Sequence, residues 1–495
     1  PVAHTTSAIS IVWKHGQLAC GCYCNTRPSL DKVPVKSISS ERFPKKFSAR
    51  RFAGTSTFVM LGLALLAVSA CSPERQGGGY WSMHTIDDEY EGADGVDAAD
   101  IDADGDLDLL VGWEESGRAM LYENPGPQRV MEDWRRTDVS AGFDVSKIED
   151  ARFADFDGDE QVDAIVSATE NRNEKVNIHW LVDRNSRFSS DAWKSTSIDP
   201  SIQQAFMKVA IVQVDGAGAM DIVVGSKADR KTDEDPAQLL WYRAPENPVY
   251  ANADLWKGEV IADIYWINTI EYMDIDQDGD NDVLISDWNV LAWYENPGEA
   301  SGAIGWKRNV ISEEADSIFT NCAPDRDDPS QIHLVVSAVS AQEVTDVGDT
   351  LFHYIRKEFD KNGDWSGKWI ESKLSSRDPL PSEIEENDYD LKGVVCGNID
   401  GDESVDLVVS ASGYGNGVFA LMNLDRELGD QSLALKVISS DRNNTRKGIK
   451  HDNLLLDDLD GDGDLDVITT EENGNTGSYF FDRGLGLIWF ENPGL

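Results

Sequence analysis

Aspartates recur at alternating positions in three short runs of the chain, a pattern typical of cation-binding loops. The run that begins at Asp100 carries acids at positions 1, 3, 5 and 9, a glycine at position 6 and an available backbone carbonyl at position 7. Carboxylates that converge within about 4 Å repel one another by about 1 kcal/mol per pair even in water, so this density requires a counter-ion. Oxygen ligands and a turn-forming glycine favour calcium over zinc or copper. The expected ligands are Asp100, Asp102, Asp104, Asp106 and Asp108; Asp274, Asp276, Asp278, Asp280 and Asp282; and Asp458, Asp460, Asp462, Asp464 and Asp466.

The spacing resembles the first half of an EF-hand loop, but the surrounding sequence differs from that motif. At position 12, where an EF-hand supplies a bidentate glutamate, the first run has Val111 and the last has Thr469. The flanking apolar pieces are short, rich in β-branched and aromatic residues, and bounded by Gly, Pro, Asn or Asp, which predicts strands rather than helices. The acidic runs are therefore expected to be loops of β-hairpins.

A repeating unit surrounds these loops from Tyr80 onward, and its clearest copy spans Trp256 to Gly298. Four apolar pieces in this copy predict four strands per unit. The last position of the acidic run recurs seven times, which divides the chain into seven units: Asp108, Asp163, Asp221, Asp282, His333, Asp406 and Asp466. One such sheet cannot cover both of its faces, whereas stacking around an axis supplies the missing cover. The expected fold is all-β, a seven-bladed β-propeller with four-stranded blades.

The two ends of the repeat region predict how the ring closes. Residues Tyr80 to Ile86 match the outer-strand pieces of other units, while the last unit stops directly after the segment Ile488 to Pro493. The N-terminal strand is therefore expected to complete the last blade, which would remove an exposed sheet edge.

The nine-residue D-x-D-x-D-G-x-x-D hairpin in a sevenfold strand repeat resembles the FG-GAP or VCBS repeats of integrin α-chain propellers and many bacterial surface proteins. The resemblance covers Tyr80 to Leu495. It implies that the hairpins join the innermost strand of each blade to the second strand and that calcium there is structural. It also implies two further sites, for about five in total: Asp155, Asp157, Asp159 and Asp163; and Asn398, Asp400, Asp402 and Asp406.

Four units depart from the hairpin pattern. Glu160 and Glu403 replace the turn glycine in the two sites that the resemblance adds. The third unit, Gln213 to Asp221, lacks acids at positions 1 and 5, and the fifth, Ala323 to His333, loses the spacing. Neither the third nor the fifth unit is expected to hold calcium well.

Charge and composition change sharply near the N-terminus. The whole chain has 44 Lys and Arg against 90 Asp and Glu, a formal charge of -46, which argues against a nucleic-acid partner or an anionic membrane surface. Residues 45–70 combine a basic start with an apolar stretch too short to span a bilayer, as in a secretory signal. The ending Val68-Ser69-Ala70-Cys71 resembles a bacterial lipobox with Cys71 lipidated, followed by a linker over residues 71–79. Residues 1–44 stay unassigned. We therefore expect an exported, monomeric lipoprotein at the outer membrane or cell surface, held to the membrane only by its lipid.

The family resemblance places ligands on the face opposite the hairpins, built by loops before the innermost strand and after the second strand. Aromatic, cationic and amide residues in these loops would suit an extracellular glycan or a protein. The first hypothesis is a non-catalytic binding module. The alternative is a carbohydrate-active enzyme, most plausibly a polysaccharide lyase acting on uronic-acid glycans, because some lyases are seven-bladed propellers. Its candidate catalytic residues would be His451, Lys450, Tyr265 and Arg172.

The cysteines of the propeller region predict no disulfide framework. Cys322 and Cys396 lie in apolar, strand-like runs. We expect both to be buried free thiols.

Overall fold

The computed structural model describes the chain after Tyr80, with gaps. The described residues are 81–171, 175–199, 201–216, 218–228, 236–245, 252–287, 290–298, 305–313, 316–320, 332–339, 352–359, 365–376, 389–402, 404–413, 417–424, 430–439, 449–473 and 484–494. The chain divides into two compact units, residues 1–74 and 75–495, and all described residues belong to the second. The signal segment 45–70, Cys71 and the linker 71–79 lie outside the described residues. Within the described part, no helix is long and apolar enough to cross a membrane.

Sixteen strands form four separate antiparallel sheets of four strands each. Consecutive strands along the chain are neighbours in every sheet, which is the pattern of a meander. The sheets are β2 (Ala93–Ala99), β3 (Asp108–Trp113), β4 (Arg118–Glu123) and β5 (Arg135–Asp138); β6 (Ile148–Ala154), β7 (Ala164–Thr169), β8 (Asn177–Leu181) and β9 (Trp193–Ser197); β10 (Ala205–Val212), β11 (Asp221–Lys227), β12 (Ala237–Arg243) and β13 (Lys257–Ile264); and β14 (Ile267–Met273), β15 (Asp282–Asp287), β16 (Val290–Glu295) and β17 (Lys307–Ser312).

The other twelve strands form one extended sheet in the order β1-β28-β27-β26-β23-β24-β25-β21-β20-β19-β18, with β22 beside β23. These strands are β1 (Ser82–Asp87), β18 (Asp316–Thr320), β19 (His333–Val339), β20 (Phe352–Phe359), β21 (Trp365–Ser376), β22 (Tyr389–Gly397), β23 (Val405–Gly413), β24 (Gly417–Leu424), β25 (Gln431–Ser439), β26 (Ile449–Asp457), β27 (Asp466–Asn473) and β28 (Gly486–Glu491).

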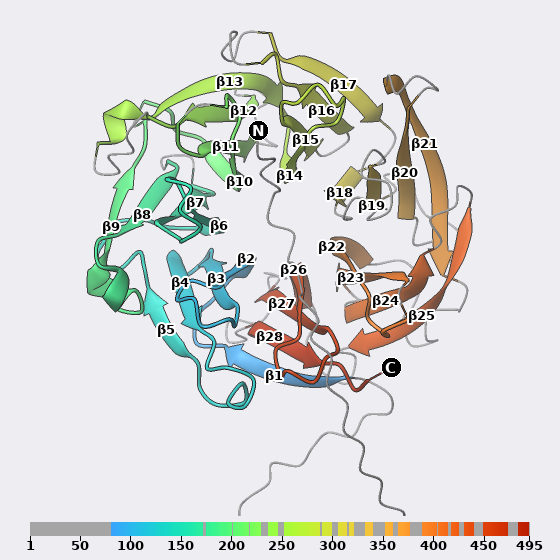
Figure 1. The fold of residues 1–495 in the computed structure, drawn as a ribbon, viewed down its shortest axis with the longest axis horizontal. Helices are drawn as coiled ribbons and strands as arrows, with labels where there is room; N and C mark the ends of the chain where they lie inside the picture. The colour runs from blue at the N-terminus through green and yellow to red at the C-terminus, as the bar shows by residue number, and fades with distance from the viewer. Residues whose placement is uncertain are drawn as a thin grey trace, which may run out of the picture. The chain divides into compact units, whose positions relative to one another are not determined.

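The sheets pack face to face in a β-propeller arrangement, which confirms the predicted all-β class with four-stranded blades. In Figure 1 the strands nearest the centre are β2, β6, β10, β14, β18, β22 and β26, and the outer strands include β5, β9, β13 and β17. Second strands are the most buried, because apolar sheets cover them on both faces: every residue of β3 and of β7 is buried. The outer strand β17 is mostly exposed or half-buried, since only one of its faces is covered.

Apolar clusters join neighbouring sheets rather than filling one common core. One cluster, with Phe156, Phe206 and Trp256, joins the sheet of β6 to the sheet of β10. Another joins β2, β3 and β4 to the C-terminal strands through Trp113 and Trp489. Each sheet therefore depends on its neighbours for burial, as the repeat predicted.

The strand nearest the N-terminus pairs with the strand nearest the C-terminus. β1 lies antiparallel to β28, with Met83 opposite Phe490 and Thr85 opposite Ile488. Trp81, directly before β1, is buried and donates its backbone N–H to the carbonyl of Ile438 at 3.1 Å. This is the strand pairing that the sequence predicted.

Cys396 of β22 corrects the expectation of free thiols. The residue is disulfide-bonded. It is the one cysteine among the described residues, and Cys322 lies outside them. Apolar surroundings suit a buried disulfide as well as a buried thiol, and the sequence pattern could not separate the two.

Candidate functional site

The acidic runs form loops between the innermost and second strands, as expected. Each predicted run with described residues connects such a pair: β2 to β3, β6 to β7, β14 to β15, β22 to β23 and β26 to β27. Carboxylate oxygens of Asp100, Asp102 and Asp104 lie within 4.8 Å of one another, and those of Asp155, Asp157 and Asp163 do the same. The loops thus bring together the acids that the spacing predicted.

Two left-handed residues, at positions 4 and 6, shape each loop in which both positions are described. Position 6 has φ of 101° at Gly105 and 104° at Gly279, which strongly favours glycine. Position 4 is Ala103, with φ of 62°, in the first loop. The side chain of the position-1 aspartate accepts the N–H groups that this turn presents: in the first loop Asp100 accepts from Asp104 and Gly105, each at 3.1 Å.

Glu160, which replaces the turn glycine, adopts φ of 66° and therefore fits the left-handed region. A side chain there is less favourable than glycine but is sterically allowed. The loop of Asp155 to Asp163 keeps its turn despite the substitution.

Three loops contain buried oxygens that have no hydrogen-bond partner. These atoms are Oδ1 of Asp102, Oδ1 of Asn398 and Oδ1 of Asp458. Burial is also the largest cause that raises the pKa of Asp102, Asp276 and Asp460, and neighbouring aspartates raise it further. Orphaned oxygens and crowded carboxylates are the donor set of a hard cation, so these residues fit calcium.

The aspartate at position 9 has a different role from the other acids. In the first loop, Oδ2 of Asp108 accepts the N–H of Ile101 at 3.2 Å and Oδ1 accepts the N–H of Asn124 at 2.8 Å. Asp282 makes the equivalent pair with Ile275 and Asn296. Further copies pair Asp406 with Ile399 and Asn423, and Asp466 with Leu459 and Asn492. Both oxygens of this carboxylate tie the hairpin to the end of the third strand.

The third unit keeps this tie although its acids at positions 1 and 5 are lost. Asp221 accepts the N–H of Val214 at 3.2 Å and that of Ala244 at 2.6 Å. The remaining acid at position 3, Asp215, pairs with Arg243 at 3.1 Å. In the fifth unit, residues 323–331 lie outside the described residues.

Charged side chains form a group opposite the hairpins, near the starts of innermost strands and the ends of second strands. We name this group the charged rim. Its members are Asp94, Glu114, Glu115, Lys147, Glu149, Glu170, Lys208, Lys227, Lys450, Asp452 and Glu472. Lys147 contacts Glu114 at 2.5 Å and Glu170 at 3.2 Å, and Lys227 also pairs with Glu170. Lys227 lies 4.5 Å from the ring centroid of Trp266. The contacts thus run from the sheet of β2 to that of β14.

The other end of the charged rim belongs to the C-terminal strands. Lys450 pairs with Asp452 at 2.8 Å and with Glu472. Carboxylate oxygens of Asp94, Asp452 and Glu472 lie within 4.8 Å of one another, and those of Asp94, Glu114 and Glu149 form a second such group. Asp94 therefore connects the C-terminal strands to the sheets of β3 and β6.

Protonation in the charged rim is shifted by burial. Burial and the Asp452 carboxylate raise the pKa of Asp94 to about 7, and burial raises the pKa of Glu472 to about 7 although Lys450 opposes it. Burial would raise the pKa of Asp452 as well, but Lys450 and Lys392 outweigh it and lower that pKa. The rim therefore contains groups that change charge near neutral pH.

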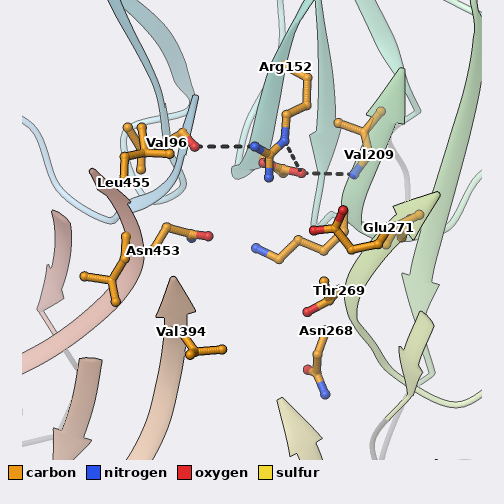
Figure 2. A pocket seen from close by; sticks show the side chains of 14 residues that line it. Val96, Arg152, Val209, Asn268, Thr269, Glu271, Val394, Asn453 and Leu455 are labelled. Carbon is orange, nitrogen blue, oxygen red and sulfur yellow. Dashed lines mark hydrogen bonds and ion pairs between the residues drawn. The ribbon is translucent and has the colours of Figure 1, made fainter. Parts of the chain in front are cut away.

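A cavity of about 130 Å³ lies between the innermost strands, adjoining the rim at Lys208. Figure 2 shows Arg152, Glu271 and Asn453 among its lining residues. Arg152 contacts the fully buried Asp150, whose Oδ2 also accepts the N–H of Val209 at 3.0 Å. Burial raises the pKa of Glu271 to about 7, although Arg152 lowers it in part. The cavity could hold several water molecules or a small polar group.

The predicted catalytic candidates are not gathered in this cavity. His451 is fully buried, with its ring centroid 6.3 Å from that of Phe490. The Lys450 ammonium is paired with carboxylates, and Tyr265 is 36% exposed. None of these three lines the cavity. Arg172 lies outside the described residues, so its part in a shared site stays a prediction.

Among the residues of the charged rim, sequence reasoning predicted only Lys450 as a candidate catalytic residue. It did not predict the cavity. The other rim residues are scattered along the chain as single charges at strand ends, and only the strand register brings them together. The signal that could have found them is a charge in or just before the first half of an innermost strand, or at the end of a second strand or just after it.

One family model and several solved structures match this chain. Residues 100–166 match the model of the FG-GAP-like repeat family. This stretch contains the first two acidic hairpins. No protein of the curated set matches the sequence.

Solved structures with related folds have low sequence identity. A chain of the crystal structure of BBS1N in complex with ARL6DN, soaked with mercury, is 12% identical, with 84% of this chain and 97% of that chain covered and a TM-score of 0.42. The Dos1 propeller is 9% identical, covering 83% and 94%, with a TM-score of 0.41. A thermostable family-43 glycoside hydrolase is 11% identical, covering 59% and 98%, with a TM-score of 0.34. No ligand or activity follows from these similarities.

Proposed function

We propose that this protein is a calcium-stabilised surface lipoprotein whose propeller binds an extracellular ligand, a glycan or a protein, on the charged rim. The acidic hairpins fix each blade from one end of its strands, and the ligand approaches the other end. Export and lipidation at Cys71 follow from the signal-like segment 45–70. The lipid is the one membrane attachment in this proposal.

The proposed ring has seven blades, the last completed by β1. The twelve-stranded sheet has two weak connections: β23 meets β26 through the single pair Ser412 and Lys450, and β21 meets β25 in parallel over three pairs. Dividing the sheet there leaves three groups of four antiparallel strands. Buried apolar clusters between β2–β4 and β27–β28 support closure of the ring.

The charged rim is the observation that carries the binding proposal. Charged groups that face one another across several blades, with little exposure, are costly to desolvate and contribute little to stability. Their position beside a cavity, which the rim adjoins at Lys208, is typical of a site that positions a polar ligand. Carboxylates outnumber lysines there, so the rim favours a neutral or positively charged ligand over a polyanion.

The charge of the rim also weighs against the alternative function, a lyase acting on uronic-acid glycans. Such an enzyme needs a cation to neutralise the substrate carboxylate and a base that can reach its proton. Lys147, Lys227 and Lys450 are all paired with carboxylates, and His451 is buried. Unsaturated products, followed by absorbance during incubation with uronic-acid polysaccharides, would nevertheless restore the lyase hypothesis.

The binding proposal is tested by retention of the protein on immobilised ligands. The panel contains neutral polysaccharides, uronic-acid polysaccharides and basic proteins. We expect retention on a neutral or basic member, and loss of it on Lys227→Glu, which breaks the ion pair with Glu170 and the contact with Trp266 that position this part of the rim. The matched control is Arg135→Glu, an exposed position on the outer strand β5. Retention on polyanions alone would contradict the proposal.

A further inference from the structure

The second acidic hairpin has two of its acids paired with one arginine. Arg184 begins the short 3-10 helix η1 (Arg184–Ser186), directly after the third strand of that blade. Its Nη1 lies 3.0 Å from Oδ2 of Asp159, and its Nη2 lies 2.5 Å from Oδ1 of Asp163. One guanidinium thus contacts the acids at positions 5 and 9 of the hairpin.

The segment that ends the third strand of each unit explains why Arg184 contacts the aspartate at position 9. In the first, fourth, sixth and seventh units, an asparagine at the end of the third strand or directly after it donates its backbone N–H to Oδ1 of the position-9 aspartate: Asn124, Asn296, Asn423 and Asn492. In the second unit Oδ1 of Asp163 accepts from Arg184 instead. Asp183 caps η1 by accepting the N–H of Asn185 at 3.1 Å, which fixes the start of the helix that bears Arg184.

Charge at the end of the third strand varies with the completeness of the hairpin. The first, fourth and seventh units have complete acidic runs and end this strand with Glu123, Glu295 and Glu491. The third unit has lost acids at positions 1 and 5, and it ends the strand with Arg243, which pairs with the remaining Asp215. In the third unit, an arginine thus pairs with the remaining acid, and this hairpin needs no external cation.

We propose that Arg184 is the built-in counter-ion of the hairpin from Asp155 to Asp163, so that this hairpin does not bind calcium. Calcium would have to displace a bidentate guanidinium from two of the expected ligands, and the positive charges would repel one another at this separation. This inference rests on the proposed calcium binding of the other hairpins. It reduces the expected sites from five to four, in the loops that begin at Asp100, Asp274, Asn398 and Asp458.

Calcium stoichiometry of the full chain tests the inference, measured by equilibrium dialysis and by native mass spectrometry. We expect four bound ions in the wild type, four in Arg184→Lys, which keeps the charge, and five in Arg184→Gln. Arg135→Gln, which removes an exposed arginine paired with Glu123 at 3.2 Å, is the matched control and is expected to keep four.

The outcomes separate this inference from the function on which it rests. Five ions in the wild type, or an unchanged count in a folded Arg184→Gln, overturn the role of Arg184 while leaving calcium binding intact. No bound ions in any of the variants overturn calcium binding itself. If Arg184→Gln does not fold, the number of calcium ions bound by the wild type still decides. Four ions support the role of Arg184, and five overturn it.

Discussion

At the scale of single residues, the acids of the hairpins divide into two roles. Aspartates at positions 1, 3 and 5 crowd together and leave orphaned oxygens such as Oδ1 of Asp102. The aspartate at position 9 uses both oxygens as hydrogen-bond acceptors for the backbone. Retention of Asp221 in a hairpin that lost its acids at positions 1 and 5 follows from this second role, because the tie does not depend on a cation.

Asp221→Asn should therefore destabilise the protein whether or not calcium is present. The amide places an N–H₂ group against one of two backbone N–H donors, and a buried donor left unpaired costs about 1–3 kcal/mol. Urea denaturation in calcium and in chelator should show similar losses of unfolding free energy. Asp254→Asn, at an exposed position, is the control and should change little. A loss that appears only in calcium would assign Asp221 to a metal site instead.

The stabilising effect of calcium should grow as the pH rises. Burial raises the pKa of Asp108, Asp282 and Asp466 to about 7 in the absence of a cation, above the ordinary value of 3.8. A raised carboxylate pKa favours the folded state at low pH, and this advantage is lost as pH rises from about 4 through 7. Bound calcium would compensate the negative charge of the ionised carboxylates, so its stabilising effect should be larger at the pH where they are ionised.

Melting temperatures with and without calcium at pH 5.5 and pH 8 measure this effect. We expect a larger calcium-induced increase at pH 8, together with proton release on binding near pH 7. An increase that is equal at both pH values would show that these carboxylates do not titrate in the relevant range.

At the scale of elements, the segment after the third strand connects one blade to the next. The side-chain amide of Asn296 donates to the carbonyl of Val214 in the preceding hairpin at 2.8 Å and to that of Asn281 in its own hairpin at 3.0 Å. Asn492 makes the same two contacts with Ile399 and Leu465. The recurrent Glu-Asn-Pro-Gly sequence is thus a link between hairpins of adjacent sheets.

Asn296→Ala should weaken this link. Two buried carbonyls and the N–H of Gly298 would lose a partner, and each buried unsatisfied group costs about 1–3 kcal/mol. Chemical denaturation should show the loss of unfolding free energy, while Asn309→Ala on the outer strand β17 serves as the control. Equal effects of the two substitutions would contradict the linking role.

The sequence predicted the strands and the hairpins because both are local. Alternating apolar residues and turn residues identify a unit such as Trp256 to Gly298 without knowledge of its neighbours. The role of Arg184, the charged rim and the disulfide of Cys396 could not be predicted in this way. Each depends on residues far apart in the chain, or on a turn whose geometry only the structure gives.

At the scale of the whole molecule, the two ends of the propeller region hold each other. β1 covers the edge of β28, and Trp81 donates to Ile438 of the neighbouring outer strand β25. A chain starting at Asp88 should therefore unfold at lower denaturant and aggregate through the exposed edge of β28. A chain starting at Gly78, which retains β1, is the control. Light scattering and urea denaturation that did not distinguish the two chains would contradict the proposed closure of the ring.

The central claim is that calcium in the acidic hairpins stabilises the propeller. Titration of the full chain with a calcium chelator, followed by melting temperature and by protease resistance, tests it most directly. We predict that both fall as calcium is removed and recover when it is restored, with magnesium a poor substitute because the loops offer many oxygen ligands at flexible distances. A melting temperature and a digestion pattern unchanged by the chelator would contradict the claim.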